Sequence, residues 1–511
     1  MRHMHYLLAI DTGSSSSKLA LFDTQGTLTA LVRKAGKVMA EEKHNAVREY
    51  DPLLWWESTA QGIQELLQTS KVHPSQILVV GLSGQIGTHI LIDQHHRTLM
   101  SAISWQDGRA AGEAQWLKEH YGSLDDSLGM HLPPGTAWPI PRLLWLKKHM
   151  PQLFDKPFTL LQTKDYLALK LTGELKTDVL SLRGLVHPLK KTLDPLVSHT
   201  ILGIGDLIDR LPPFQQATDV LGFITTEAAQ ATGLLAGTPV ITGCGDFHAS
   251  LVGTGIVDGS HAFNITGTSD HIGLLVPQGN KQAYDPRLGR YPSVVEGWDI
   301  WYGATSAGGG SLQWFLDSFG NREKNQTIKA YIEGMLKEIE GPSGMLYLPY
   351  LNGERAPLWD AQARGTFFGF SAAHTKAHFL KAVLEGVCFS LKDCYAIMEE
   401  KQTVPLRIRV SGAAGADHLW NQMKADILQT ELQGMECQET SSLGAAMLAA
   451  VGIGAYATIQ EAAETMVRTT TVYTPKAIHQ KAYETMFTLY RNLYEGLKPR
   501  FEELAQLRSN Q

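Results

Sequence analysis

A polar turn between two apolar runs is the feature that most restricts how this chain can fold. Residues 6–10 are typical of a buried strand, Asp11-Thr-Gly-Ser-Ser-Ser-Ser17 follows as a tight turn, and residues 18–23 return as a second strand. This order predicts a hairpin of two antiparallel strands. Backbone N–H groups around a glycine and neighbouring hydroxyls bind phosphate oxygens. The turn therefore predicts a phosphate site, and an ordinary serine–glycine turn after an edge strand is the alternative.

The same kind of turn occurs a second time near the middle of the chain. Thr266-Gly-Thr-Ser269 repeats the pattern of Thr12-Gly-Ser-Ser15, again between two apolar runs. We interpret this repeat as indicating two domains of related fold, joined near residues 247–260. Because the match is only four residues long, chance agreement is the alternative.

Strands and helices alternate along the rest of the sequence, which predicts the α/β fold class. Asp51 and Pro52 have the pattern of a helix N-cap and first helical residue, and residues 77–82 are typical of a strand. Apolar residues at helical spacing predict a long helix over residues 375–400 and a C-terminal helix or helix pair from about residue 475. A chain of 511 residues is too long for one hydrophobic core, so more than one domain is expected.

Composition and charge narrow the partners and the compartment. Hydrophobic residues make up 43% of the chain and charged residues 19%, which is typical of a globular protein. A net charge of -6 without a long basic run does not indicate binding to nucleic acid or to a membrane surface. The four cysteines form no CxxC pair, and Asp11 interrupts the N-terminal apolar run, so we expect a cytoplasmic protein with reduced thiols. Residues 443–457 are short for a membrane span and predict a buried helix and turn.

Two carboxylates stand where predicted strands end. Asp246 closes the segment Gly243-Cys-Gly-Asp246, and its flanking glycines leave the side chain uncrowded. Such a carboxylate accepts a proton from a substrate hydroxyl during phosphoryl transfer, although a cap on the helix that begins near Phe247 is the alternative. Asp11 is a candidate for binding Mg²⁺ through water, and Lys18 adds a positive charge nearby.

Glycine-rich segments precede two predicted helices. Gly303–Gly310 and Gly412–Gly415 are turns of the kind that let a base and its phosphates lie against backbone and helix N-termini. Helix caps and close helix packing are the alternatives. The sequence contains no GxxxxGK[ST] loop, no GxGxxG after a strand, no protein-kinase motif set and no GxSxG elbow, which argues against those classes of enzyme.

Taken together and in order, these segments resemble the FGGY carbohydrate kinases, and within that family the xylulose kinases most. The resemblance spans residues 6 to about 455, and these segments carry it: Ile10-Asp-Thr-Gly-Ser-Ser-Ser-Ser-Lys18, Gly81-Leu-Ser-Gly-Gln85, Ile103-Ser-Trp-Gln-Asp-Gly-Arg109, Gly243-Cys-Gly-Asp246, Gly267-Thr-Ser269, Asn352-Gly-Glu-Arg-Ala-Pro357, Ala363-Arg-Gly365, Leu384-Glu-Gly386, Ser411-Gly-Ala-Ala414 and Ser441-Ser-Leu-Gly-Ala-Ala446.

The resemblance implies two actin-like, hexokinase-type (RNase H-like) domains around a central cleft. Residues 1–252 would form the sugar and phosphate side, and residues 253–511 the nucleotide side with a helical tail from about residue 475. ATP and Mg²⁺ would be needed to phosphorylate a small sugar, most simply D-xylulose to D-xylulose 5-phosphate. A homodimer is the habit of the family, and no nucleic-acid or membrane partner is expected.

The resemblance also assigns roles to individual residues. Asp246 would be the catalytic base, with Asp11 beside the metal and the phosphates, and both carboxylates would bind Mg²⁺. The sugar would contact Gln85, Ile86, Gly87, Trp105, Asp107, Arg109, Asp246 and Phe247. ATP would contact Gly13, Ser14, Ser15, Ser16, Lys18, Gly267, Thr268, Gly309, Gln313, Gly412, Ala413 and Asp417.

The sequence departs from the family pattern on the sugar side. Xylulose kinases usually carry Met-His after the Gly-Gln of the sugar loop, and this chain has Ile86 and Gly87 there. Phe247 stands where Asn or Gln is frequent. Loss of hydrogen-bonding groups changes which hydroxylated substrate a pocket selects. Another ketose, a polyol or a sugar acid is therefore an alternative substrate, and a weakly catalytic sugar sensor or an actin-like ATPase is an alternative function.

Overall fold

The structure is a computed structural model that describes most of the chain. The described residues are 5–14, 16–36, 38–42, 47–280, 282, 284–323, 326–337, 339–401, 404–412, 415 and 417–509. Two residues of the predicted nucleotide site, Ser15 and Ala413, lie outside them. The chain forms two compact units: unit 1 consists of Met1–Val257, Tyr291–Gly297 and Glu439–Val467, and unit 2 of Asp258–Arg290, Trp298–Gln438 and Arg468–Gln511.

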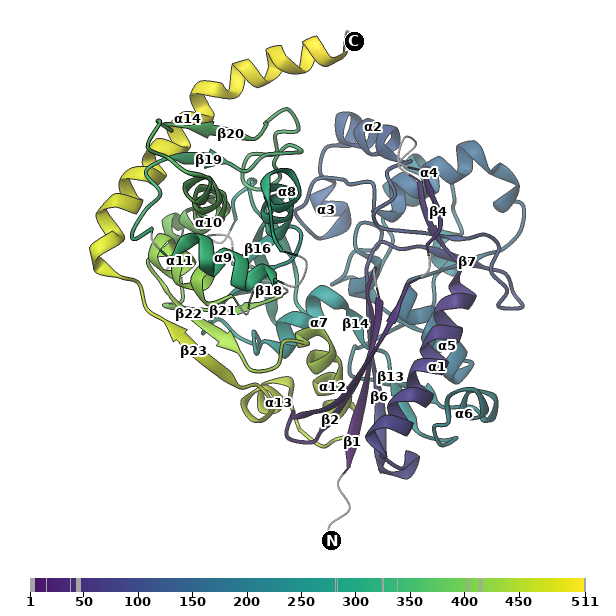
Figure 1. Ribbon diagram of the computed structural model, residues 1–511. Helices are drawn as coiled ribbons and strands as arrows, with labels where there is room; N and C mark the ends of the chain where they lie inside the picture. The colour runs from purple at the N-terminus through teal and green to yellow at the C-terminus, as the bar shows by residue number, and fades with distance from the viewer. Residues whose placement is uncertain are drawn as a thin grey trace. The chain divides into compact units, whose positions relative to one another are not determined.

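A twisted sheet forms the centre of unit 1 (Figure 1). Its strands lie in the order β12-β13-β6-β1-β2-β3, and β14 also pairs with β6. Their bounds are β1 (Tyr6–Thr12), β2 (Ser16–Asp23), β3 (Leu28–Ala35), β6 (Ile77–Gly84), β12 (Val220–Phe223), β13 (Pro239–Ile241) and β14 (Cys244–Gly245). β1 is antiparallel to β2 and parallel to β6, so the predicted hairpin over residues 6–23 is confirmed.

Helices cover this sheet for reasons that are visible in the sequence. α1 (Pro52–Ser70) begins where predicted, because the Asp51 side chain accepts the backbone N–H of Leu53. Its residues Ile63 and Leu66 are buried against Leu8 and Leu19 of the hairpin. Each fully buried aliphatic side chain of this kind contributes about 1.5–3 kcal/mol.

A second helix reaches unit 1 from far along the sequence. α12 (Thr440–Gly452) packs on β6, on β1 and on α7 (Asp246–Gly253). A Cβ atom added at Gly81 would lie 2.3 Å from the Ala445 carbonyl oxygen, and one at Gly253 would lie 1.9 Å from that of Thr440. The glycines therefore permit direct backbone contact, which places residues 439–467 in unit 1. The buried helix predicted from residue 443 is confirmed.

Unit 2 contains a sheet of the same design. Its strands include, in this order, β18-β16-β15-β21-β22-β23. Their bounds are β15 (Ala262–Thr266), β16 (Asp270–Pro277), β18 (Trp298–Thr305), β21 (Arg407–Ser411), β22 (Glu431–Met435) and β23 (Thr469–Tyr473). β15 is antiparallel to β16 and parallel to β21, as β1 is to β2 and β6. The short repeat in the sequence therefore marks hairpins at the same position of two related sheets.

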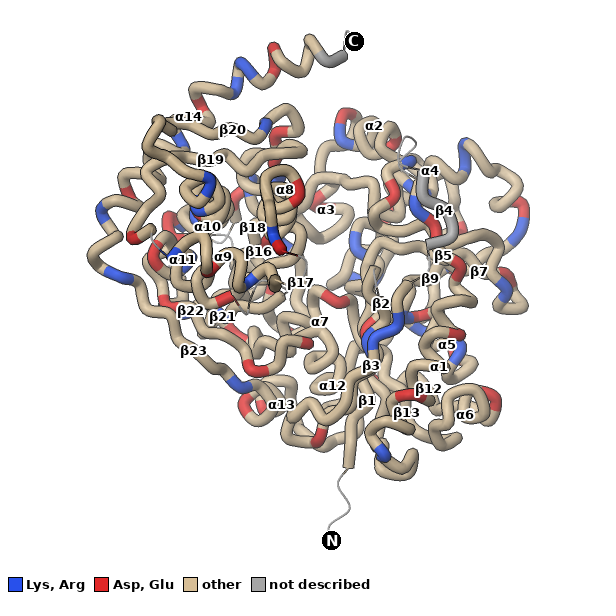
Figure 2. Tube along the Cα trace, in the orientation of Figure 1, with Lys and Arg blue, Asp and Glu red and all other residues tan. Residues whose placement is uncertain are grey.

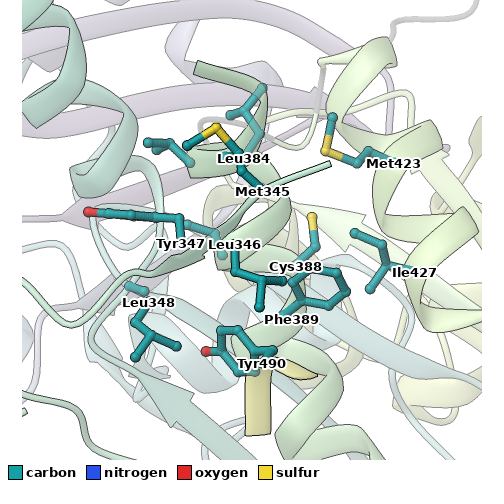
Figure 3. Close-up of a cluster of buried hydrophobic side chains, with 14 of the residues drawn as sticks. Met345, Leu346, Tyr347, Leu348, Leu384, Cys388, Phe389, Met423, Ile427 and Tyr490 are labelled. Atoms are coloured by element: carbon teal, nitrogen blue, oxygen red, sulfur yellow. The ribbon is translucent and has the colours of Figure 1, made fainter. Parts of the chain in front are cut away.

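The core of unit 2 gathers around a long helix. α10 (Lys376–Lys401) confirms the helix predicted over residues 375–400. Its Leu384, Cys388 and Phe389 pack with β19 (Leu346–Leu348) and with Tyr490 of the C-terminal helix α14 (Ala477–Ser509), as Figure 3 shows. One detail of the sequence interpretation is wrong: Gly303 lies within β18, so the turn before α8 (Gly309–Phe319) is shorter than predicted.

Charged residues of both signs are interspersed along both units (Figure 2). Within the residues described, no helix is long and apolar enough to cross a membrane. The assignment of residues 1–252 to the sugar and of residues 253–511 to the nucleotide stays a prediction.

Candidate active site

The first hairpin places opposite charges side by side. Asp11 on β1 is directly opposite Lys18 on β2, and the Lys18 Nζ lies 3.4 Å from Asp11 Oδ2 and 3.2 Å from Glu439 Oε2. Ser83 at the end of β6 donates its hydroxyl to Asp11 Oδ1 at 3.2 Å. Burial lowers the pKa of Lys18, but the charges of Asp11 and Glu439 outweigh it and the net shift is upward. Lys18 is therefore a fixed cation at the end of this hairpin.

Hydrogen bonds to backbone carbonyls hold the turn of this hairpin, and Ser14 and Ser16 in it are partly exposed. The Gly13 N–H donates to the Ser16 carbonyl at 3.1 Å, and the Tyr50 hydroxyl donates to the Ser14 carbonyl at 2.8 Å. Gly13, Ser14 and Ser16 are all partly exposed. An ordered turn with accessible hydroxyls and a cation is what phosphate binding requires.

Asp246 lies at the start of a helix, beside the same charges. It is the first residue of α7, whose N-cap is Gly245, and its Oδ1 accepts the Phe247 N–H at 2.8 Å, so the carboxylate also binds the start of the helix. Burial, and then the charge of Asp11, raise the pKa of Asp246 to about 7, against the opposing effects of the Phe247 N–H, Arg183 and Lys18. A carboxylate that titrates near neutral pH is suited to accept a proton from a hydroxyl.

The glycines before Asp246 are required by close packing. Gly243 has φ +65°, and a Cβ atom there would lie 1.9 Å from the Leu82 carbonyl oxygen. A Cβ atom at Gly245 would lie 2.0 Å from Ile86 Cδ1. Ile86 therefore lies directly against the backbone that presents Asp246, so an apolar side chain borders the base.

The backbone after β6 explains why this chain has Gly87 where the family pattern has histidine. Gly87 has φ +84°, and a Cβ atom there would lie 2.9 Å from the Ala137 carbonyl oxygen. A histidine would not fit this backbone. Thr88 and His89, the nearest polar replacements, are both buried, and Thr88 is occupied in accepting the Trp105 N–H at 3.1 Å.

Gln85 has a buried side-chain amide that forms no hydrogen bond with the described residues. Its backbone N–H donates to the Thr12 carbonyl at 2.9 Å, which ties it to the first hairpin. The side chain is 2% exposed, and neither amide atom has a hydrogen-bond partner among the described residues. Such a group is costly unless a water or a ligand satisfies it, which supports its predicted contact with the sugar.

The predicted sugar residues from 105 to 109 separate into two kinds. Trp105 is 42% exposed and offers a flat apolar face. Asp107 is fully buried and accepts from the Arg48 N–H at 2.7 Å and from Arg109 Nε at 2.8 Å. Burial raises the pKa of Asp107, but these bonds outweigh it and lower the pKa overall. Arg109 also binds Glu49 at 2.7 Å, so this pair of residues supports the loop.

Phe247 lies beside the base and is partly exposed. Its ring centroid is 6.0 Å from that of His248 in an edge-on arrangement. His248 is buried and contacts the Pro292 carbonyl through Nε2 at 3.1 Å, and burial lowers its pKa to about 4. The neutral imidazole therefore has a packing role.

Unit 2 contains a pocket of about 350 Å³ lined by most of the predicted nucleotide residues that are described in this unit. The lining residues are Gly267, Gly309, Leu312, Gln313, Leu316, Ile328, Lys329, Ile332, Asp417 and Trp420. Asp417 caps α11 (His418–Leu428) by accepting the Trp420 N–H at 2.8 Å. Gln313 donates to Asp317 at 2.7 Å, and Thr268 is exposed on the turn next to the pocket-lining Gly267. The apolar walls supplied by α8 and α9 (Ile328–Leu336) suit a flat base.

Gly412 is not among the lining residues, and its conformation is specific. It has φ +90°, and a Cβ atom there would lie 2.4 Å from the Thr266 carbonyl oxygen. The Gly415 N–H donates to its carbonyl at 2.9 Å, which closes the turn after β21. Only glycine allows the end of β21 to lie this close to the second hairpin.

Sequence reasoning missed a buried lysine in each unit. Lys424 is fully buried and donates to Asn264 at 2.7 Å and to Thr266 at 2.6 Å, with Asp270 at 3.7 Å. Lys164 lies between Asp165 at 2.7 Å and another buried carboxylate, Asp178, at 2.8 Å. A charge inside an otherwise apolar helical stripe was the available signal. Each network lies directly behind a predicted site segment and supports it.

The motif around Glu354 positions the start of α8. Glu354 accepts the backbone N–H groups of Ser306 and Arg355, and Arg355 donates to the Thr305 carbonyl at 2.6 Å. Burial raises the pKa of Glu354 to about 7 in spite of these bonds. The motif therefore fixes the turn that leads into the pocket helix, which gives the sequence pattern a structural reason.

A pair of carboxylates is the candidate metal site. Within the described part of the chain, no group of three or more His, Cys, Asp or Glu residues is arranged to hold a metal ion. Asp11 and Asp246 are near enough for the charge of one to raise the pKa of the other. Mg²⁺ is commonly held by one or two carboxylates together with water and substrate phosphates, so this pair fits that ion.

Two actin-like units, a phosphate-type hairpin in each and a carboxylate that titrates near neutrality define a small-molecule phosphotransferase. The chain belongs to the FGGY family of carbohydrate kinases: its residues 6–253 match the N-terminal domain of that family and residues 262–453 the C-terminal domain. It is an ATP-dependent sugar kinase.

Relatives with different substrates resemble the chain over its full length. It is 32% identical to a xylulose kinase of Bacillus subtilis (strain 168), over 99% of this chain and 100% of that one. A ligand-bound xylulose kinase and a gluconate kinase, both from Lactobacillus acidophilus, each match with a TM-score of 0.87 and 26% identity, over 98% of this chain and 100% of theirs. The fold is therefore shared by kinases of a ketose and of a sugar acid.

Proposed function

We propose that the chain is a cytoplasmic kinase that transfers the γ-phosphate of ATP to D-xylulose and forms D-xylulose 5-phosphate. The environment of Asp246 is the observation that carries the chemistry. Its carboxylate begins α7 beside Asp11, and its pKa is raised to about 7. The full-length similarity to xylulose kinases supports the choice of sugar.

The reaction follows from the groups at the site. Asp246 takes the proton of the substrate hydroxyl, the hydroxyl oxygen forms a bond to the γ-phosphorus, and the bond from that phosphorus to the bridging oxygen breaks to release ADP. Lys18 and the N–H and hydroxyl groups of the first hairpin stabilise the phosphoryl oxygens. Gln85 and Trp105 bind the sugar, and Gly267, Gly309 and Gln313 bind the nucleotide.

Mg²⁺ is part of this proposal. Asp11 and Asp246 would hold it together with phosphate oxygens of ATP. When bound, the ion neutralises charge on the β- and γ-phosphates. Asp11 is already oriented for this role by the Ser83 hydroxyl, 3.2 Å from Oδ1.

A second substrate class has its own support in Arg183. This residue directly follows the short helix η3 (Val179–Leu182), which packs on β14 just before Asp246. Its charge lowers the pKa of Asp246, and it is partly exposed. Among the described residues it has no hydrogen-bond or ion-pair partner. A guanidinium close enough to Asp246 to lower its pKa would bind a carboxylate, so a sugar acid is the alternative to D-xylulose.

A coupled assay of ADP release separates these readings. The panel contains D-xylulose, L-xylulose, glycerol, gluconate and a 3-keto sugar acid, each with Mg-ATP. The proposal expects the highest kcat/KM with D-xylulose, and the highest value with a sugar acid would overturn the choice of sugar. ATP binding without transfer to any compound would favour a sugar sensor, and hydrolysis that ignores sugars would favour an actin-like ATPase. Light scattering on the same sample tests the homodimer.

A further inference from the structure

We infer that Arg142 is the positioning residue of the sugar side, because its guanidinium joins the loops that carry Gly87, Trp105 and Asp107. This inference rests on the proposed function of the site. Arg142 belongs to α4 (Pro139–His149), in a segment to which sequence patterns gave no role. It touches no reacting atom and acts through the backbone of other residues.

Backbone carbonyl oxygens accept all five N–H groups of this side chain. Nε donates to Thr136 at 2.9 Å. Nη1 donates to Gly87 at 3.1 Å and to Ile103 at 2.7 Å. Nη2 donates to Ser104 at 2.5 Å and to Asp107 at 3.3 Å. A guanidinium has five N–H donors in a fixed plane, so the donor set is complete.

The charge of Arg142 is buried without a carboxylate directly on it. The residue is 2% exposed, and burial lowers its pKa to about 10, with the charge of Asp107 opposing this shift. It therefore remains a cation at neutral pH. A buried charge that is solvated only by carbonyl oxygens keeps them in place, because leaving any donor unpaired would be costly.

The bonded carbonyls lie on either side of the groups proposed to touch the sugar. Gly87 has no room for a side chain, so only its backbone defines that wall of the site. Ser104 and Asp107 flank the exposed Trp105, whose N–H is bound by Thr88. Arg142 thus fixes the Gly87 backbone relative to the backbone on either side of Trp105, and a Cβ atom at Gly87 would lie 3.4 Å from Trp105 Cβ, so the two segments are direct neighbours.

The test compares Arg142→Met, which keeps the volume and removes all donors, with Arg142→Lys, which keeps the charge and has three donors. We expect Arg142→Met to raise the sugar KM at least about tenfold, while the KM for ATP changes less than about twofold. Arg142→Lys should lie between this variant and the wild type. Arg210→Met is the control, because Arg210 also binds a backbone carbonyl, that of Lys156, and is not part of the site.

Amide hydrogen exchange gives a second measurement that does not need activity. In Arg142→Met, exchange should become faster in peptides covering residues 85–109 and stay unchanged in peptides covering α10. Equal losses for sugar and ATP, with faster exchange throughout unit 1, would show a general folding role and overturn the inference. An unchanged sugar KM and unchanged exchange would also overturn it. If the wild type phosphorylates no sugar, the proposed function fails, and exchange still decides the role of Arg142.

Discussion

The two hairpins occupy the same position in two related sheets but carry different chemistry. In the first, Asp11 and Lys18 lie at the turn with Glu439 beside them. In the second, the residue at the position of Asp11 is the apolar Ile265, and the cation is Lys424, fully buried behind the strands. The comparison shows that one topology was used twice, with a partly exposed cation in one unit and a fully buried cation in the other.

The turns are also held in different ways. The first is closed by its own backbone and by the Tyr50 hydroxyl. The second is joined to α8, because the Gly309 N–H donates to the Gly267 carbonyl at 2.8 Å and the Gly310 N–H to that of Thr268 at 2.9 Å. A turn joined to a pocket helix suits binding of the nucleotide, and a turn beside a partly exposed cation suits the transfer step.

The largest expected effect is at the base in the first unit. Asp246→Asn should lower kcat by about 10³-fold, because general-base catalysis contributes on the order of 10²–10⁴. Nucleotide binding, measured by calorimetry, should be near normal.

A measurement of stability distinguishes the expected loss of kcat in Asp246→Asn from a loss of folding. The folded-state pKa of Asp246 is raised to about 7, so ionisation of this carboxyl costs the fold stability as pH rises from about 4 to about 7, and the full cost remains above that pH. At about pH 8, Asp246→Asn should be at least as stable as the wild type. The exposed Asp209→Asn is the control, and near-normal kcat in Asp246→Asn would contradict the role of the base.

The next largest effect, on the free energy of unfolding, is expected at Lys424, the buried cation of unit 2. Lys424→Met should lower the free energy of unfolding by about 3–5 kcal/mol, because it leaves the Asp270 charge buried without its partner. The pKa of Asp270 is already raised to about 6 by burial, and loss of Lys424 raises it further. Variant and wild type share the same unfolded-state carboxyl, so the defect should grow from about pH 6 upward, where Asp270 ionises in the folded wild type and not in the variant.

Urea unfolding at several pH values measures this effect. The double variant with Asp270→Asn should recover part of the loss at neutral pH and little at low pH. A pH-independent defect would show that Lys424 acts through packing alone.

A smaller effect tests the link between the second turn and α8. A Cβ atom at Gly308 would lie 2.6 Å from the backbone of Ser269. Overpacking of this size costs about 1–3 kcal/mol, so Gly308→Ala should raise the KM for ATP about tenfold and leave the sugar KM unchanged. Gly496→Ala in α14 is the matched control, because a Cβ atom there meets nothing within 4 Å. Equal effects on both substrates would contradict a role confined to the nucleotide.

The smallest effect is expected at Arg183, a cation whose charge acts on the base. Arg183 lowers the pKa of Asp246, so Arg183→Gln should move the acidic limb of the pH profile of kcat/KM toward higher pH. If D-xylulose is the substrate, the maximum rate above that limb should hardly change. If a sugar acid is the substrate, the variant should bind it much more weakly than the wild type does. An unmoved limb would show that Asp246 does not set it.

Local patterns in the sequence predicted the parts of the site that depend on neighbours along the chain. Both hairpins, the N-cap at Asp51 and the glycines before Asp246 are such cases, since strand alternation and turn glycines act over a few residues. Arg142 could not be found this way. Its five acceptors come from segments as far as residue 87, and nothing in Pro139–His149 distinguishes it from a surface cation of an amphipathic helix.

The same reason explains the unexpected state of Asp107 and Arg109. The resemblance to the family placed them with Trp105 at the sugar. In the structure they bind each other, and Arg109 binds Glu49, while their contact with the sugar stays a prediction. Which of residues 105–109 faces a ligand depends on the direction of the backbone, and no periodicity in the sequence shows that. The apolar residues that line the unit 2 pocket, such as Leu312 and Ile328, could not be predicted from the sequence either, because they resemble ordinary core residues.

The return of residues 439–467 to unit 1 has a consequence for biosynthesis. α12 packs directly on the backbone at Gly81 and Gly253, where a residue with a side chain would not fit. A nascent chain that has emerged only to residue 257 therefore presents an uncovered sheet face. Unit 1 completes its core after residue 452 has left the ribosome, so translation of the intervening residues is a period in which this face needs protection.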